Sequence, residues 1–339
     1  DFKAYHCPVA SEPLEYGDLP NFYCERLAKF LSLRCHRNVN SSRIIGTTGV
    51  SHGLDILCTV LTKNIKDRSK CIVYVEDATY FLSMNIFRDH GFEVRSVTTD
   101  KQGMIIDDLL IMLLSDIKLG KTPLCVYTIP VFNNPTGYCM SDTRRRYLLK
   151  ITNKYNMSVI ADEVYQMLDY TQYIGNGNNT NTNNTNRSLI PRLPSSLIAY
   201  CTGDDGVEIY THVYSLSSFS KILSPGLRVG WIECSSNQQI ESIWSLGFMA
   251  SGSTTCHYSS NLVACLMANI EYPTNNGTMY TSLLSNESVC TSPLWIHINT
   301  LCKLYATKYT TLTTSLTKHS NSILDPLDPL DPLDPLDPL

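Results

Sequence analysis

A lysine, a serine and an arginine in the segment 214–230 (Y-S-L-S-S-F-S-K-I-L-S-P-G-L-R-V-G) are well suited to chemistry. Lys221 stands among small hydroxyl residues, where a strand-like alternation of apolar residues breaks off. A lysine in an apolar, hydroxyl-lined turn is suited to form an imine with a carbonyl group. Ser218 and Arg228 could bind one phosphate group, the serine as a neutral donor and the arginine through its planar fork. The alternative is a solvated surface lysine, which is the usual state of an arbitrary lysine.

A glycine-bearing turn before a helix offers a second place for an anion. The run G-T-T-G-V-S-H-G-L-D-I-L-C leads into a helix predicted over 51–63. Gly49, Val50 and Ser51 lie at its start, where free backbone N–H groups favour a negative charge. An ordinary serine-capped helix has the same pattern, so a phosphate site and a simple cap both remain open.

The elements that must position these residues alternate along the chain. Strands are predicted over 71–75, 92–97, 124–129, 157–161, 213–216 and 228–234. Further helices are predicted over 79–90, 107–118, 141–155, 240–250, 258–271 and 294–316. This alternation predicts an α/β fold, with a sheet covered by helices on both faces. Tyr80, Asn134 and Asp162 follow strand ends, where open α/β sheets bind ligands.

The composition of the sequence changes along its length and predicts four parts. They are an N-terminal segment over 1–40, a large domain over 41–250, the helical start of a C-terminal domain over 251–323, and a tail over 324–339. Residues 175–187 form an Asn-rich insert, and such a polar run cannot bury enough surface to order itself. The tail repeats Asp-Pro-Leu, and a proline at every third position excludes helix and sheet.

The charge and cysteine content exclude several classes of protein. The net charge of −4 is outweighed by the five aspartates of the C-terminal repeat, so the rest is nearly neutral and nucleic acid is not an expected partner. The 13 cysteines show no C-x-x-C spacing, which predicts buried reduced thiols and no metal site. The sequence shows no secretory signal and no apolar run of membrane-spanning length, which predicts a soluble cytoplasmic protein without a membrane partner.

Four motifs, in order along the chain, carry a resemblance to a known family. They read V-Y-V-E-D-A-T-Y-F, I-P-V-F-N-N-P-T-G, V-I-A-D-E-V-Y and S-S-F-S-K-I-L-S-P-G-L-R-V-G-W. From about residue 16 to about residue 316 the sequence resembles the class I/II aminotransferases, which are pyridoxal-phosphate-dependent enzymes of fold type I. The resemblance implies a mixed, mostly parallel sheet sandwiched by helices. It also implies pyridoxal 5'-phosphate as cofactor, with an amino acid and a 2-oxo acid as substrates.

The resemblance implies a role for each residue at the strand ends. Lys221 would form a Schiff base with the cofactor and later move a proton, and Asp162 would pair with the pyridinium nitrogen. Asn134 and Tyr165 would hydrogen-bond the phenolic oxygen of the cofactor, and Tyr80 would stack on its ring. Each also has a structural reading: Asp162 as a helix cap, Asn134 as a turn residue before proline, and Tyr80 as part of the core.

The resemblance also implies how the phosphate and a second subunit would be bound. Phosphate contacts would come from the helix start and from two later residues, namely Gly49, Val50, Ser51, Ser218 and Arg228. Tyr16 matches a family tyrosine that reaches the phosphate of the neighbouring subunit. A homodimer with shared sites is therefore expected.

The sequence departs from the family near its C-terminal end. We find no match to the family's P-x-G-G-x-F-x-W strand or to the later arginine that binds the substrate carboxylate, which implies an incomplete small domain. The leading interpretation is an aminotransferase acting on an aromatic amino acid or on 2-aminoadipate. The alternatives are a non-catalytic or degraded homologue that binds pyridoxal phosphate, and a lyase or decarboxylase of the same fold.

Overall fold

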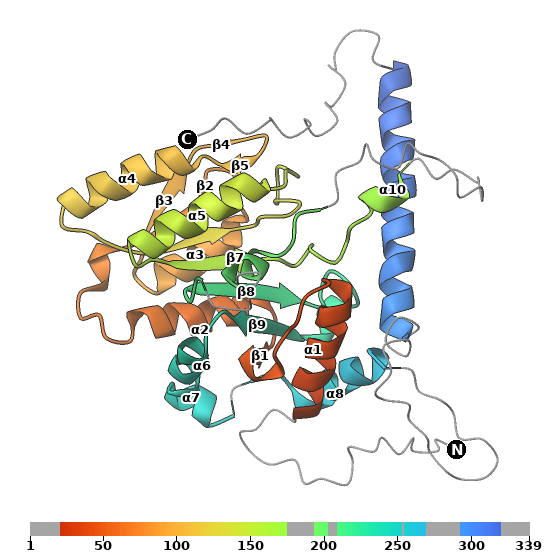
Figure 1. Ribbon diagram of the computed structural model, residues 1–339, viewed down its shortest axis with the longest axis horizontal. Coiled ribbons are helices and arrows are strands. Elements are labelled where there is room, and N and C mark those ends of the chain that lie inside the picture. The colour runs from red at the N-terminus through yellow and green to blue at the C-terminus, as the bar shows by residue number, and fades with distance from the viewer. Residues whose placement is uncertain (1–20, 175–192, 203–208, 253, 269–291, 320–339) are drawn as a thin grey trace.

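The computed structural model describes residues 21–174, 193–202, 209–252, 254–268 and 292–319 (Figure 1). Its centre is a single seven-stranded sheet. In the order in which they lie side by side, the strands are β1 (Ile44–Thr47), β9 (Gly230–Cys234), β8 (Val213–Ser218), β7 (Ser158–Asp162), β6 (Thr122–Thr128), β2 (Cys71–Glu76) and β3 (Glu93–Val97). All six residues of β2 are buried, as expected for an apolar strand covered on both faces.

The direction of the strands decides where a ligand could bind. Strands β3, β2, β6, β7 and β8 pair in parallel, whereas β9 runs antiparallel to both β8 and β1. The carboxyl ends of the parallel strands therefore meet at one edge of the sheet. Asp162 and Ser218 are the last residues of β7 and β8, so both lie at this edge.

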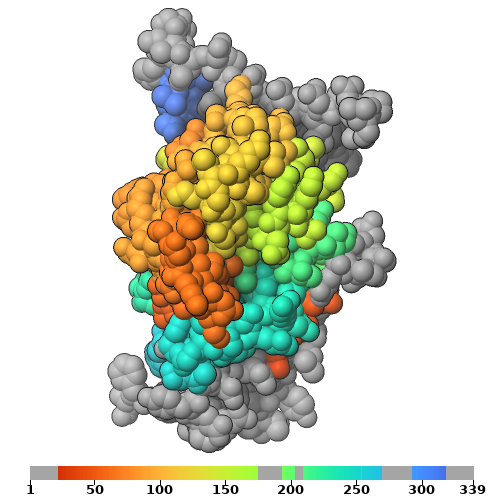
Figure 2. Space-filling view, turned by 90° about the vertical axis from the view of Figure 1, so that its left-hand side faces the viewer, coloured from red at the N-terminus to blue at the C-terminus, as the bar shows by residue number. Residues whose placement is uncertain are grey.

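Helices cover both faces of the sheet (Figure 1). One face is packed by α2 (Val50–Thr62), α3 (Phe81–Asp89), α6 (Asn237–Trp244) and α7 (Gly247–Ala250). The other is packed by α4 (Ile106–Lys118) and α5 (Asp142–Lys154), with α1 (Asn21–Arg34) and α8 (His257–Leu266) at its β1–β9 end. Figure 2 shows α4 in yellow and α5 in yellow-green on one continuous surface with the teal α6–α7 segment.

The long helix α10 (Pro293–His319) stands beside the sheet and its covering helices (Figure 1). Its first turns pack against α1, where Leu294 and Ile298 join the buried cluster that includes Phe30. Farther along, Leu312 and Leu316 are exposed. Within the described ranges, no helix is both long and apolar enough to cross a membrane.

The predicted α/β fold with a mostly parallel sheet is confirmed, with local differences. The strand predicted from Arg228 begins at Gly230, because Arg228 has a left-handed backbone (φ 52°). The helix predicted over 240–250 is two helices, α6 and α7. Strand β1 and the hairpin of β4 (Thr99–Asp100) and β5 (Gly103–Met104) were not predicted.

Several predictions concern parts of the chain that the structure leaves undescribed. The Asn-rich insert over 175–187 and the tail over 324–339 lie outside the described residues, and so does Tyr16. The division into domains stays a prediction. The prediction of buried thiols is confirmed for Cys58, Cys71, Cys125, Cys201 and Cys234, but it is wrong for Cys256, which is exposed at the start of α8.

Candidate active site

Asp162 is a buried carboxyl group at the end of the central strand β7. Its side chain is 5% exposed, and its Oδ2 accepts a hydrogen bond of 2.8 Å from the hydroxyl of Tyr127. Its Oδ1 is also buried, and no described residue gives it a hydrogen bond. Burial raises the pKa of Asp162 to about 6, against the opposing effects of the Tyr127 hydrogen bond, the nearby backbone N–H of Val164 and the positive charge of Lys221. One oxygen of this carboxylate is thus free to accept a donor from a ligand.

Tyr165 and Asn134 meet beside Asp162, although they come from different loops. The side chain of Asn134 hydrogen-bonds Tyr165, which lies in the turn after β7. Burial raises the pKa of Tyr165, and the negative charge of Asp162 and the nearby Tyr80 act in the same direction. The structure therefore brings together four of the predicted residues: Tyr80, Asn134, Asp162 and Tyr165.

Lys221 lies in the turn after β8, and its side chain is exposed. The turn is closed by N–H groups of Ile222, Leu223 and Ser224, which all donate to the carbonyl of Phe219. This turn directs Phe219 and Ile222 into the core and leaves Lys221 outside. The apolar surroundings predicted for Lys221 are therefore wrong for this structure, but its charge still acts on Asp162.

The predicted phosphate residues meet where the start of α2 approaches β9. Gly49 precedes α2 with φ +122°, and a Cβ atom on it would lie 3.2 Å from Nη2 of Arg228. A Cβ atom on Gly230 would lie 2.9 Å from Cα of Gly49 and 2.7 Å from the carbonyl oxygen of Ser217. The two glycines permit this close approach, and the guanidinium of Arg228 lies over the helix start.

The hydroxyl of Ser218 near this helix start is already hydrogen-bonded within the protein, and it also accepts from the backbone N–H of Ser220 (3.1 Å). Oγ of Ser218 donates to the carbonyl of Val229 (3.2 Å) and lies 2.8 Å from Oγ of Ser220. Val50 packs against the core and Ser51 is exposed, both in the first turn of α2. Backbone N–H groups in a first helical turn have no intrahelical acceptor, so an anion could take their place as partner.

His52 was not predicted as a site residue. Its side chain caps the backbone before α2, where the N-cap Gly49 has no side chain to do so. Its Nδ1 accepts a hydrogen bond of 3.1 Å from the backbone N–H of Thr48. Burial lowers the pKa of His52, which favours the neutral ring that can accept this bond. Its position in the first turn of the predicted helix was the available signal, but a histidine at such a position does not by itself indicate a capping role.

Glu76, at the end of β2, is a buried carboxylate that sequence reasoning missed. It accepts hydrogen bonds from the hydroxyl of Thr128, from the backbone N–H of Ile129 (3.2 Å) and from the side chain of Asn133 (3.3 Å). Burial raises its pKa to about 7. Glu76 thereby anchors the start of the loop that carries Asn134. A charged residue ending an apolar strand was the available signal.

Arg145 holds the same loop from the α5 side. It is fully buried, and it donates to the carbonyls of Pro130 (2.7 Å), Met140 (2.8 Å) and Ser195 (2.9 Å). Pro130 and Met140 bracket the loop with Asn134, so Arg145 fixes both ends of it. No local pattern marks this arginine, because its acceptors are backbone groups brought close only by folding.

Comparison with known proteins identifies the fold and then the family. A kynurenine aminotransferase of Pyrococcus horikoshii has the same fold, with a TM-score of 0.65 at 23% identity over 90% of this chain and 62% of that one. The profile of the family "Aminotransferase class I and II" matches residues 12–302. The chain belongs to the class I and II aminotransferase family.

Two relatives with similar sequences are named aromatic amino acid aminotransferases. An aromatic amino acid aminotransferase of Schizosaccharomyces pombe is 31% identical over 230 residues, which are 66% of this chain and 44% of that protein. Aromatic-amino-acid aminotransferase 1 of Thermococcus litoralis is 32% identical over 225 residues, which are 66% of this chain and 46% of that protein. The chain therefore spans less than half the length of these relatives.

Proposed function

We propose that this chain binds pyridoxal 5'-phosphate at the ends of β7 and β8 and transfers an amino group from an amino acid to a 2-oxo acid. The observation that carries the proposal is Asp162, a buried carboxylate with one oxygen lacking a partner. An unpaired buried carboxylate oxygen is costly for the fold alone, so its retention favours a ligand that donates to it. The protonated ring nitrogen of the cofactor is such a donor.

The other residues of the site fit the remaining parts of this cofactor. The start of α2, the guanidinium of Arg228 and the hydroxyl of Ser218 would hold the phosphate. Asn134 and Tyr165, which already meet, would hold the phenolic oxygen. The fit includes donors for the phosphate and an acceptor for the ring nitrogen.

When bound, this cofactor supplies an electron sink for a carbanion at the substrate Cα. A pKa of about 6 leaves Asp162 largely ionised at neutral pH, so it would hold a proton on the ring nitrogen. Nζ of Lys221 would attach the cofactor covalently and, once released, carry a proton from the substrate Cα. The exposure of Lys221 leaves its amine accessible for both tasks.

We propose an aromatic amino acid as the donor, with 2-aminoadipate as the alternative that the sequence left open. The support is that the two relatives described above are aromatic amino acid aminotransferases by name. We also propose a homodimer in which Tyr16 of one subunit reaches the phosphate in the other. This part rests on the resemblance of the Tyr-Gly motif alone.

The test is to locate the cofactor chemically. Purified protein mixed with pyridoxal 5'-phosphate should develop visible absorbance, and borohydride should fix the cofactor on the peptide that contains Lys221. Lys221→Ala should abolish labelling and lower transamination of L-tyrosine at least about 100-fold, whereas the exposed-site control Lys70→Ala should change neither. Labelling at another lysine would refute the assignment. Labelling without amino transfer would favour the non-catalytic homologue.

A further inference from the structure

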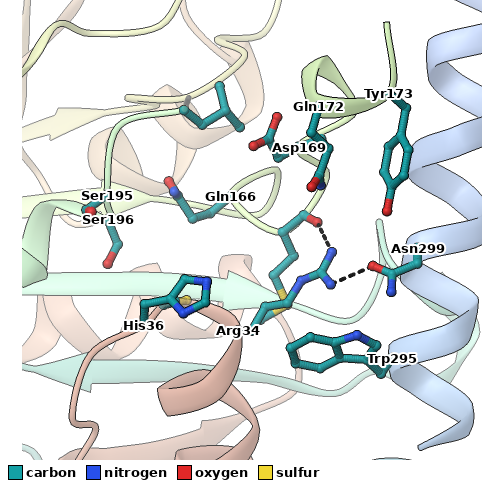
Figure 3. Close-up of a pocket in the computed structure, with 13 residues that line it drawn as sticks. Arg34, His36, Gln166, Asp169, Gln172, Tyr173, Ser195, Ser196, Trp295 and Asn299 are labelled. Carbon is teal, nitrogen blue, oxygen red and sulfur yellow. Dashed lines mark hydrogen bonds between the residues drawn. The ribbon is translucent and has the colours of Figure 1, made fainter. Parts of the chain in front are cut away.

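A cavity of about 290 Å³ lies between the end of α1, the segment after Tyr165 and the first turns of α10 (Figure 3). None of the residues proposed to contact the cofactor lines it. Its size is close to the lower limit for small-molecule pockets, so it suits a metabolite rather than a nucleotide cofactor.

Two polar atoms on one side of this cavity have no partner among the described residues. Ser196 is only 5% exposed, and its Oγ makes no hydrogen bond. The Nε2 of Gln166 donates to the carbonyl of Pro194 (2.8 Å), which fixes the amide orientation and leaves the buried Oε1 without a donor. Unpaired buried polar atoms are rare in folded proteins, and two on one cavity wall indicate a missing donor.

The opposite side of the cavity carries a positive charge that is held in place. Nη1 of Arg34 donates to Oδ1 of Asn299 (2.7 Å), and Nη2 donates to the carbonyl of Met167 (3.2 Å). The guanidinium also lies 4.9 Å from the ring centre of Trp295. No carboxylate of the described residues forms an ion pair with Arg34, and a guanidinium has five N–H groups, so donors remain for an anion.

Figure 3 shows Gln166 and Ser196 on one side and Arg34, Asn299 and Trp295 on the other. Acceptors thus face a fixed cation across a space of small-molecule size. An ammonium group suits the acceptor side, and a carboxylate suits Arg34. A ligand with only one of these charges would satisfy only one wall.

We propose that this cavity binds a free amino acid, with its carboxylate on Arg34 and its ammonium on Oε1 of Gln166 and Oγ of Ser196. Asp169 is the only acidic residue of the lining, so the cavity holds one carboxylate besides the fixed guanidinium. Gln166 directly follows Tyr165, so the bound amino acid would contact the segment that carries Asp162. The site is distinct from the proposed catalytic one and does not require catalysis.

Calorimetric titration of the purified chain without cofactor tests the proposal. The probes are L-phenylalanine, whose charges are adjacent, and 5-aminopentanoate, whose charges are far apart; pentanoate and pentylamine each carry one charge. At least one of the two amino acids should bind saturably at one site. The affinity of each single-charge compound should be lower by a factor of at least about ten. No saturable binding of either amino acid, or equal binding of a single-charge compound, would overturn the proposal.

Variants then place the binding in this cavity. Ser196→Ala should weaken binding about fivefold and Arg34→Gln at least about tenfold. Ser141→Ala is the matched control, because Ser141 also has a buried hydroxyl without a partner but lies outside the cavity. Asp162→Asn separates this site from the proposed catalytic one, and both controls should leave the affinity unchanged. Unchanged binding in Ser196→Ala, checked to unfold at the parent temperature, would place the ligand elsewhere.

Discussion

Asp162 and Glu163 are consecutive carboxylates at the end of β7, both buried, and they lie on opposite faces of the sheet. Asp162 points to the face of α2 and α3, where Tyr127 satisfies one of its oxygens. Glu163 uses both oxygens: Oε1 accepts from the backbone N–H of Leu197 (2.7 Å), and Oε2 accepts from the hydroxyl of Ser215. Two buried carboxylates at the end of the same strand thus differ in whether both of their oxygens accept a hydrogen bond.

This difference in hydrogen bonding distinguishes residues that stabilise the fold from residues that can bind a ligand. A carboxylate with a donor on each oxygen is already used by the fold, and its removal would cost stability. A carboxylate with an unpaired oxygen stabilises the fold less and can bind a donor. The serines of β8 differ by face and not by this measure: Oγ of Ser217 donates to the carbonyl of Glu163 (3.3 Å), whereas Ser218, which is also hydrogen-bonded, lies at the proposed phosphate site.

The largest expected effect is the loss of amino transfer when Asp162 is changed. If the rate did not fall, Asp162 and Glu163 would not differ in function. Asp162→Asn should slow amino transfer by about 100- to 1,000-fold, because the amide cannot hold a proton on the cofactor ring nitrogen. The thermal unfolding temperature of the cofactor-free protein should not fall, because the change removes a buried charge. Single-turnover absorbance spectra with L-tyrosine measure the rate. Equal rates in variant and parent would contradict the proposed role.

The next effect concerns Glu76 at the end of β2, which changes the pH dependence of stability. Burial raises its pKa from 4.5 to about 7, so the folded state binds its proton more tightly than the unfolded state does. Stability from this group is therefore full below about pH 4.5 and is lost as pH rises through about 7, by roughly 3 kcal/mol in all. Glu76→Gln keeps an acceptor and should flatten this decline.

Urea unfolding of cofactor-free protein between pH 5 and pH 8 measures this change. The matched control is Glu241→Gln, the same change at an exposed carboxylate on α6, which should leave the slope of stability against pH close to that of the parent. A parent-like slope in Glu76→Gln would show that another group titrates there.

A smaller effect is expected on the other face. Glu163→Gln should lower the free energy of unfolding by about 1–2 kcal/mol, because one of its two hydrogen bonds must rearrange. The amino transfer rate should stay within about a factor of three of the parent, since Glu163 has no role toward the ligand. Denaturant titration and rate measurement on the same preparation distinguish this pattern from that of Asp162→Asn. A large rate loss without destabilisation would remove the distinction between the faces.

The smallest effect separates the two serines of β8. Ser218→Ala should weaken binding of pyridoxal 5'-phosphate about fivefold, the loss of one hydrogen bond to the phosphate. Ser217→Ala removes the same atom on the other face and should leave this affinity unchanged. Equilibrium titration of cofactor absorbance measures both. If Ser217→Ala has the larger effect, the proposed phosphate site is misplaced.

The sequence by itself determined the alternation of strands and helices and the positions of residues at strand ends. Apolar runs such as C-I-V-Y-V are local properties, and their lengths correctly predicted the buried parallel strands. The four motifs were sufficient to identify the family, whose profile covers residues 12–302. Even the proximity of Asn134 and Tyr165 could be expected, because parallel strands end at the same edge.

Only the tertiary structure decided which polar atoms are left without a partner. The bond from Tyr127 to Asp162, the approach of Gly49 to Gly230 and the three carbonyls around Arg145 join residues far apart in sequence. Such contacts depend on strand register and helix packing, which no local pattern contains. The free oxygen of Asp162 and the exposure of Lys221 are likewise set by these contacts, since burial and hydrogen bonding are properties of the packed chain.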